Sequence, residues 1–386
     1  MLMQTGMNNE TLKRRNRGLI LKLITTGECA TRIDLARRTG LSKMSVSNVI
    51  NEFLAEGIVA ERDAVAVRGQ GRNPIELVLS PAAPKLIGLH VFRDECVAVL
   101  CDLHLTPLRE ARVRLDEEKA GRLTDVLCGL IDRVLPGAEE RVLGIGVGSI
   151  GPVELSRGVI LNPPRFFGVH DYPIVDELSA RFRLPVYLDG QYNCAALAEK
   201  YFGSGRPYQD FVFVGISNGI GSGVLSGGEV LRAAGGLTSE LGHVSIDWHG
   251  NPCACGNRGC LETYAGTHVL ERRFWEQTGE RLDFAGICAR ADEPLPAALL
   301  GELVDALGCA LTTHVNLLQP EAILLGHEGC ALPDRFLHQL EELVNRRRLV
   351  RGTRRVPVLR SAFGVQAQVR SSACSLLSHV FEGEFV

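Results

Sequence analysis

ELGHVSIDWHGNPCACGNRGCLE, at residues 240–262, is the most specific pattern in this chain of 386 residues. One histidine, His243, precedes three closely spaced cysteines, Cys253, Cys255 and Cys260. Three thiolates and one imidazole form a tetrahedral ligand set that favours zinc over magnesium or calcium. Because four protein ligands leave no open coordination position, the pattern predicts a structural zinc ion and no metal catalysis.

Two details of this prediction have alternatives. His249 is a competing nitrogen ligand, although we favour His243. The three thiols could also be unrelated buried side chains. The other nine of the 12 cysteines are scattered, many of them within apolar runs, as is typical of small buried side chains.

The composition is that of a globular protein with more than one domain. Hydrophobic residues make up 45% and charged residues 23% of the chain, and its length predicts two or three domains. We find no apolar run of the roughly 18 residues that span a bilayer. The N-terminal segment has neither the long apolar core nor the cleavage site of a secretory signal. We therefore expect a cytoplasmic protein with no membrane partner.

The charge is unevenly distributed along the chain. Residues 10–72 carry twelve Lys or Arg against seven Asp or Glu, a net charge of +5, whereas the rest of the chain carries −8. A basic module attached to an acidic body indicates nucleic acid as the partner of the basic part.

Three short helices are predicted within this basic part. Apolar residues recur at helical spacing over 11–26, and two further helices follow at 31–39 and 42–56. Thr31 and Asp34 have the spacing of a capping box at the start of the second helix. Two helices joined by a short turn that contains glycine form a helix-turn-helix.

The third helix carries the side chains expected to contact DNA. Short donors and acceptors on its exposed side can approach base edges in a major groove, and the lysine among them can also reach phosphate. The candidates are Lys43, Ser45, Ser47, Asn48 and Asn51. The alternative is a three-helix interaction module with a solvated polar face.

Two strands predicted at 58–62 and 75–79 follow the helices, with a glycine-rich loop between them. Arg68, Gln70 and Arg72 lie in this loop. A flexible basic wing of this kind suits a minor groove, whose negative potential attracts arginine. Residues 1–80 therefore read as a winged helix-turn-helix DNA-binding domain.

Strands and helices alternate in the remaining sequence. We expect strands at 86–92, 96–103, 141–152, 184–190, 211–225 and 322–326, and helices near 123–134, 193–203 and 298–318. This alternation predicts two α/β lobes with a cleft between them. We expect the first lobe at 81–190, completed by 365–386, and the second at 191–364, with a zinc loop at 243–260.

The order of these motifs, together with the cysteine cluster, resembles the ROK family of repressors and sugar kinases. With the winged helix in front, the chain is similar to the xylose- and N-acetylglucosamine-type repressors of that family. The resemblance implies an α+β winged helix-turn-helix followed by a two-lobed, actin-like (ribonuclease H-like) α/β body. It also implies a homodimer or homotetramer.

Kinases of this family need three features that this sequence retains poorly. The first phosphate turn is replaced by residues 90–95, which lack its glycines. Gly190-Gln191 stands where the family has an Asn-Asp pair, and a glutamine amide cannot act as the general base. The second phosphate turn, at residues 217–221, is partly retained. Because a lost general base costs roughly 10²–10⁴ in rate, we expect no kinase activity.

The residues that hold a sugar in this family are better preserved. The resemblance implies ligand contacts from Glu240, His243 and Glu262, with Gln191 in the place of the missing base. His243 has two ring nitrogens, so it could bind zinc with one and a ligand hydroxyl with the other. The alternative for the two glutamates is a solvated role or a role in bracing the zinc loop.

These patterns predict a transcriptional repressor that binds a double-stranded DNA operator and responds to a sugar or sugar phosphate. Two alternatives stay open from sequence. One is an active ROK-type sugar kinase with an accessory N-terminal domain, and the other is a regulator controlled by a protein partner.

Overall fold

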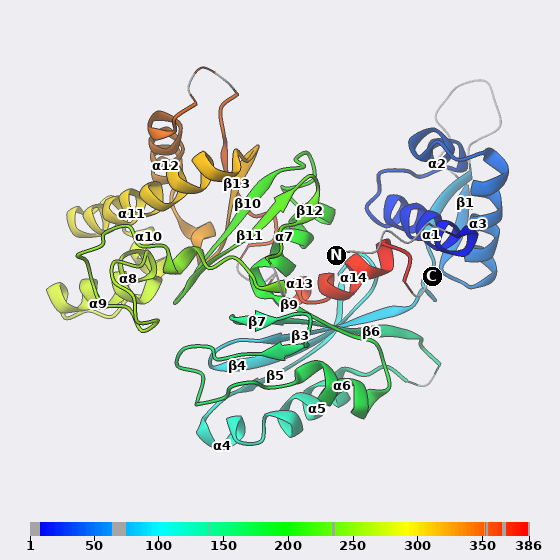
Figure 1. Ribbon diagram of the computed structural model, residues 1–386, viewed down its shortest axis with the longest axis horizontal. Coiled ribbons are helices and arrows are strands. Elements are labelled where there is room, and N and C mark those ends of the chain that lie inside the picture. Colours follow the sequence, from blue (N-terminus) through cyan, green and yellow to red (C-terminus); the bar gives the residue numbers. More distant parts are fainter. Residues whose placement is uncertain are drawn as a thin grey trace. The chain divides into compact units, whose positions relative to one another are not determined.

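The computed structural model describes residues 8–63, 75–137, 139–233, 236–350, 352, 354–364 and 368–384 (Figure 1). The chain divides into two compact units. The first unit comprises Met1–Gly148, Val175–Leu188 and Ser372–Val386, and the second comprises Ser149–Ile174 and Asp189–Ser371. The division of the sequence into 1–80, 81–190 and 191–364 stays a prediction.

The first unit begins with three helices and an antiparallel strand pair, which we call the N-terminal module. Each helix begins at a residue whose side chain accepts a hydrogen bond from a backbone N–H of the first turn: Asn8, Thr31 or Ser42. The three predicted helices and both predicted strands are confirmed. Their bounds are α1 Asn9–Thr25, α2 Arg32–Thr39, α3 Lys43–Ala55, β1 Val59–Asp63 and β2 Ile75–Leu79.

A buried arginine joins α1 to α3 inside this module. Arg17 donates to Glu56 at 2.9 Å and to Glu52, and its guanidinium lies 4.7 Å from the centre of the Phe53 ring. The Arg17 side chain is 8% exposed, whereas the side chains of Glu52 and Glu56 are 34% and 40% exposed, so the two ion pairs lie at the edge of the module. Around Arg17 lie the apolar residues of the module core, namely Ile20, Leu21, Leu35, Val46 and Ile50.

The rest of the first unit is built on a five-stranded sheet with the order β5-β4-β3-β6-β9. The strands are β3 Lys85–Val91, β4 Glu95–Cys101, β5 Pro107–Arg114, β6 Val142–Ser149 and β9 Val186–Gly190, and the helices are α4 Glu117–Ala120, α5 Leu123–Val134, α6 Ile174–Phe182 and α14 Cys374–Phe381. Helix α5 covers one face of this sheet and α14 lies on the other (Figure 1). Strand β5 was not predicted, because four of the eight residues of this edge strand are charged and exposed.

The second unit contains another five-stranded sheet, with the order β12-β11-β10-β13-β14. Its strands are β10 Phe211–Ile216, β11 Ile220–Ser226, β12 Glu229–Val230, β13 Ala322–His327 and β14 Val358–Arg360. Strand β10 pairs antiparallel with β11 and parallel with β13. The other elements of this unit are a small sheet of β7 Val153–Glu154 and β8 Val159–Ile160, the helices α7 Gln191–Phe202, α8 Glu262–Ala265, α9 Thr267–Thr278, α10 Phe284–Ala289, α11 Pro294–Leu318, α12 Asp334–Arg347 and α13 Gln368–Ser371, and the short 3-10 helices η2 Leu241–His243 and η3 Glu328–Ala331.

Helix α11 is long and apolar enough to cross a membrane by length and composition, which the sequence reading did not anticipate. Its most apolar stretch is 56% buried inside the second unit. Leu299, Leu303, Leu307 and Leu311 from this helix belong to the core between the sheet and α12. The burial is that of a core helix.

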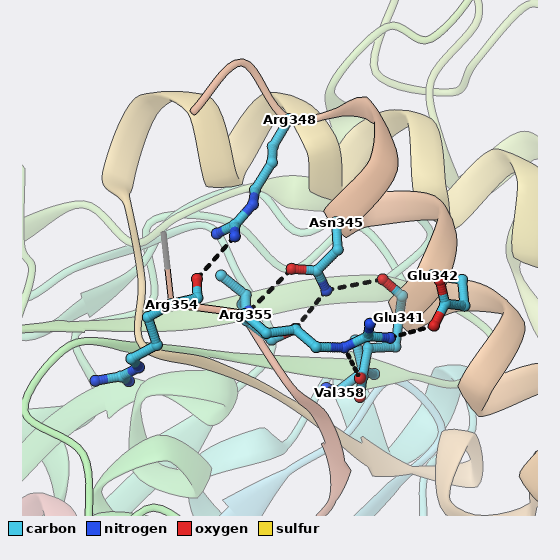
Figure 2. Close-up of polar contacts among 8 residues, drawn as sticks. Glu341, Glu342, Asn345, Arg348, Arg354, Arg355 and Val358 are labelled. Atoms are coloured by element: carbon cyan, nitrogen blue, oxygen red, sulfur yellow. Dashed lines mark hydrogen bonds and ion pairs between the residues drawn. The ribbon is translucent and has the colours of Figure 1, made fainter. Parts of the chain in front are cut away.

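Helix α12 holds the edge strand β14 through side chains that bind its backbone (Figure 2). Asn345 donates to the Val356 carbonyl at 2.8 Å and accepts from the Val356 N–H at 3.0 Å. Glu341 accepts from Arg355 at 2.7 Å and from the Val358 N–H at 3.0 Å. These bonds satisfy backbone groups that have no neighbouring strand on that side.

The N-terminal module contacts the C-terminal end of the chain within the first unit. Gly18 of α1 lies against the turn that follows α14, so that a Cβ atom there would be 2.5 Å from the Gly383 nitrogen and from the Phe381 carbonyl oxygen. At the other end of α1, His104 Nδ1 is 2.9 Å from the carbonyl oxygen of Thr25. Helix α1 is therefore attached at two points.

We expect Gly18→Ala to destabilise the protein, although Gly→Ala inside a helix normally stabilises it by roughly 0.5–1 kcal/mol. The reason is that the new methyl group overlaps backbone atoms of the C-terminal turn. Such overpacking costs about 1–3 kcal/mol. Thermal unfolding measures the effect. Gly129→Ala in α5 is the control, because its Cβ meets no atom within 4 Å and should stabilise. Equal stabilisation by both variants would contradict the described contact.

Candidate functional site

The cysteine loop of the second unit folds back on itself over residues 244–261. The Ile246 N–H donates to the Gly259 carbonyl at 2.8 Å, and the Cys253 N–H donates to the Asn257 carbonyl at 2.9 Å. The Leu261 N–H closes the loop on the carbonyl of Val244 at 3.0 Å. These backbone bonds bring residues that are distant along the loop to one point.

Four side chains meet at that point: His243, Cys253, Cys255 and Cys260. Their ligand atoms all lie within 4.8 Å of one another. Cys255 Sγ is 3.7 Å from Cys260 Sγ, and Cys253 Sγ is 3.6 Å from His243 Nδ1. In tetrahedral zinc sites the ligand bonds imply sulfur–sulfur separations of about 3.8 Å and sulfur–nitrogen separations of about 3.6 Å. The four groups therefore fit a tetrahedral metal ion.

The geometry also separates the two candidate histidines. His243 Nδ1 faces the sulfurs, which leaves Nε2 as the nitrogen that could contact another group. His249 is not among the four clustered residues, and its backbone N–H donates a hydrogen bond to the carboxylate of Asp247 at 3.0 Å. Of the two nitrogen ligands considered from sequence, the structure therefore groups His243 with the cysteines.

A polar hollow of about 250 Å³ lies beside the cysteine loop in the same unit. It is lined almost entirely by small residues, hydroxyls and amides, and Glu240 is the one charged side chain among the lining residues. They are Ser149, Gly151, Gly190, Gln191, Tyr192, Asn193, Ser222, Thr238, Ser239 and Glu240. A surface of this chemistry suits a ligand with several hydroxyl groups.

Asn193 is a buried polar residue among those that line this hollow. Its side chain is 1% exposed, and its Nδ2 donates to Asp189 at 2.8 Å. Its Oδ1 has no hydrogen-bond partner in the described part of the chain. A buried acceptor left unsatisfied is costly, so a donor from a bound molecule would stabilise it.

Asp189 is a buried carboxylate beside the hollow that the sequence reading missed. It accepts from Arg232 at 2.6 Å, from Asn193, and from the Gly190 N–H at 2.7 Å. Two of these donors, Asn193 and the Gly190 N–H, belong to the start of α7, so Asp189 holds that start in place. Its position directly before Gly190-Gln191 was the available signal.

Glu240 and Glu262 lie close enough for their charges to interact. Surrounding protein atoms, and the nearby Glu262 carboxylate, raise the pKa of Glu240 to about 7. Glu262 accepts from the Ile220 N–H at 3.3 Å and is 3.7 Å from the guanidinium of Arg165. Gln191 and Glu240 thus share one hollow, whereas Glu262 contacts the 217–221 turn and His243 belongs to the cysteine cluster.

An aromatic ring occupies the space above the glycines of the second sheet. Gly215 and Gly221 are paired in register on β10 and β11, and a Cβ atom at either position would overlap the ring of Tyr192. That ring also stacks on His327, with centroids 5.3 Å apart. These glycines are therefore explained by the packing of Tyr192.

The turn at residues 90–95 is compact. The Phe92 N–H donates to the Glu95 carbonyl at 2.9 Å, and the rings of His90 and Phe92 stack with centroids 3.8 Å apart. His90 Nδ1 is also 2.9 Å from the Ser372 hydroxyl. The aromatic rings of His90 and Phe92 therefore pack within this turn.

On the third helix of the N-terminal module, four of the five predicted contact residues are exposed and Ser47 is half-buried. Asn51 accepts from Arg32 at 3.0 Å, and Arg32 also donates to Glu61 at 2.9 Å. Arg32 therefore adds a cation to this face, which the sequence reading missed. Met44, also missed, is 75% exposed beside Lys43. Arg68, Gln70 and Arg72 lie outside the described residues.

Comparisons with known proteins agree with these features. The chain is 28% identical to a xylose repressor of Caldicellulosiruptor bescii over 89% of this chain and 90% of that protein. It is 27% identical to the DNA-binding transcriptional dual regulator NagC of Escherichia coli over 97% of each chain.

Solved structures show the same fold. A ROK family transcriptional regulator, a homologue of the Escherichia coli MLC protein, has a TM-score of 0.81 at 24% identity and covers 97% of this chain and 98% of its own. The ROK hexokinase of Thermus thermophilus has a TM-score of 0.64 at 29% identity and covers 75% of this chain and 97% of its own. The ROK family model matches residues 86–374, well over half of the sequence. The chain belongs to the ROK family.

Proposed function

We propose that this protein is a sequence-specific transcriptional repressor of the cytoplasm whose affinity for its DNA operator is controlled by a sugar or sugar phosphate. The observation that carries the proposal is the N-terminal module. The regulators span this chain from end to end, whereas the hexokinase covers 75% of it and the family match begins at residue 86, beyond the module.

The form of the module supports DNA as its partner. Its helices and strand pair have the order of a winged helix-turn-helix, and α3 presents Lys43, Ser45, Asn48 and Asn51 on an exposed face. A homodimer would carry two such helices, and a homotetramer would carry four. Helices about 34 Å apart can bind two half-sites on one side of the duplex, so a ligand that changes their spacing would release the operator.

The chemistry of the hollow supports a sugar as the effector. Hydroxyl and amide groups line it, Asn193 offers an unsatisfied acceptor, and Glu240 offers a carboxylate. The xylose and N-acetylglucosamine regulators among the relatives support the same class of ligand. His243 and Glu262 are proposed as further contacts.

We propose that the hollow does not catalyse phosphate transfer. Gln191 lines it where the family kinases have their base, and the buried Asp189 is held as an ion pair with Arg232, which favours its unprotonated form and makes it a weak base. Tyr192 fills the space above Gly215 and Gly221. A sugar kinase is the second candidate function, because the Glu240 carboxylate shares the hollow with Gln191.

DNA binding is tested with duplex fragments from the protein's own genomic neighbourhood. We expect Lys43→Ala to weaken binding to every duplex and to reduce the slope of log affinity against log salt by about 1. Asn48→Ala should cost about 1–3 kcal/mol on the preferred duplex only, because it removes a base contact. Lys119→Ala on α4 is the control and should change neither. Binding without sequence preference or salt dependence would exclude the proposed function.

We propose that the cluster of His243 and three cysteines holds a structural zinc ion. Elemental analysis of the undenatured protein should find one zinc per chain. Metal binding contributes to the free energy of folding, and each kcal/mol of lost folding stability lowers Tm by about 2–4 °C in a domain of this size. Cys255→Ser or chelation should therefore lower Tm by roughly 10 °C. Cys309→Ser on α11 is the control, because its thiol lies outside the cluster. Protein free of zinc but fully stable would contradict this prediction.

Replacing Glu240 should separate ligand binding from DNA binding. At pH 8, above the raised pKa of Glu240, Glu240→Gln removes a charged acceptor worth about 1.5–3 kcal/mol, so the affinity for an activating sugar should fall roughly 10- to 100-fold. Thermal shifts with D-xylose, N-acetyl-D-glucosamine and its 6-phosphate measure this, and DNA affinity and zinc content should not change. Glu229→Gln, an exposed residue of β12, is the control.

The same preparations decide between repressor and kinase. ADP release over this sugar panel should stay at background in the wild-type protein. Turnover that depends on Glu240 would instead support the kinase.

A further inference from the structure

The residues of strand β9 are divided between the first and the second unit. Its last residue, Gly190, and the following Gln191 line the hollow of the second unit. Three residues before Gly190, Tyr187 belongs to the first unit and contacts the C-terminal end of the chain. The strand is thus a continuous covalent connection from the hollow to that end.

Tyr187 makes three contacts with the end of the chain. Its hydroxyl donates to Glu384, and its ring stacks on His379 with centroids 3.9 Å apart and planes at 25°. Its carbonyl accepts from the Ser375 hydroxyl at 3.0 Å. His379 Nδ1 is also 3.1 Å from the Glu384 carboxylate, which closes a small network. We call Tyr187, Ser375, His379, Gly383 and Glu384 the C-terminal clasp.

The clasp contacts the first helix of the N-terminal module through backbone atoms. Gly383 has a φ of +98°, and a Cβ atom there would overlap the carbonyl of Arg14 and the nitrogen of Arg15. In the same way, a Cβ atom on Gly18 of α1 would overlap the backbone of Gly383. With no side chain between the two segments, a displacement of the turn at Gly383 is transferred directly to α1.

The second attachment of α1 does not involve β9. His104, between β4 and β5, contacts the carbonyl of Thr25 at the C-terminal end of the helix. The clasp contacts the helix at Arg14 and Gly18, on its preceding turns. A movement of the clasp alone would therefore rotate α1 about its end at Thr25.

We propose that Tyr187 is a positioning residue that couples the hollow at Gly190-Gln191 to the orientation of α1 and hence of the DNA-contacting helix α3. The coupling rests on the proposed function, because it assigns a route to the ligand response. A ligand that draws Gly190 and Gln191 toward it displaces β9. The stacked ring and the hydroxyl of Tyr187 then carry this displacement to His379, Glu384 and the turn against α1.

Hydrogen exchange on the full-length protein tests whether Tyr187 holds the module. Tyr187→Phe keeps the ring on His379 and removes the hydrogen bond to Glu384. We expect exchange in residues 9–25 and 374–384 to become about tenfold faster, because a hydrogen bond to a charged group is lost. Tyr208→Phe in the second unit is the control and should leave these segments unchanged. Wild-type exchange in Tyr187→Phe would overturn the proposal.

Operator affinity, measured with and without sugar, shows whether Tyr187 transmits the ligand response or only stabilises the contact with α1. The probes are D-xylose and N-acetyl-D-glucosamine. We expect Tyr187→Phe to bind the operator but to lose most of the sugar-dependent change in affinity. Glu384→Gln keeps an acceptor for the hydroxyl and should be intermediate in both exchange and sugar response. A full sugar response in Tyr187→Phe, despite faster exchange, would limit this residue to structural support and overturn the coupling.

Failure of the proposed function gives a different result. A wild-type protein that binds no operator, or that binds it without any sugar response, would refute the repressor model. The wild-type and Tyr187→Phe exchange rates would still decide whether the clasp holds α1.

Discussion

The direct backbone contact between α1 and the turn after α14 is the constraint on which the arrangement of the first unit depends. The N-terminal module is held together internally by Arg17 and its two glutamate partners. Its attachment to the rest of the unit includes the close approach of Gly18 to Gly383 and the contact of His104 with Thr25. A module that is held together internally can change its orientation as a body without unfolding.

The segment from Thr238 to Glu262 connects two sites of the second unit. Its first residues line the polar hollow, and the following ones supply the four clustered ligands. A single 3-10 turn separates the residues that line the hollow from the clustered ligands, and in it the His243 N–H donates to the Glu240 carbonyl at 3.0 Å. A metal ion bound at His243 would therefore limit the positions that Glu240 can adopt. The proposed metal site and the proposed ligand site are thus linked through one backbone hydrogen bond.

Local patterns were predicted well from sequence, and contacts between distant segments were not. The helices of the N-terminal module, most strands of the two large sheets and the set of His243 with three cysteines follow from short-range spacing, and all are present. Strand β5 was missed because its exposed charged residues do not resemble a buried strand. The pair of Asp189 and Arg232 and the contact of Tyr187 with Glu384 depend on tertiary folding, which residue spacing does not encode.

The contact between α1 and Gly383 also sets the order of events during synthesis. Helix α1 leaves the ribosome long before the turn at Gly383 that receives it, because more than 350 residues separate the two along the chain. The three helices of the module can fold together early, because their contacts are local. Their docking onto this turn must wait until Gly383 has been synthesised. A nascent chain, or one truncated before Gly383, would consequently carry a folded module that is not anchored at this point.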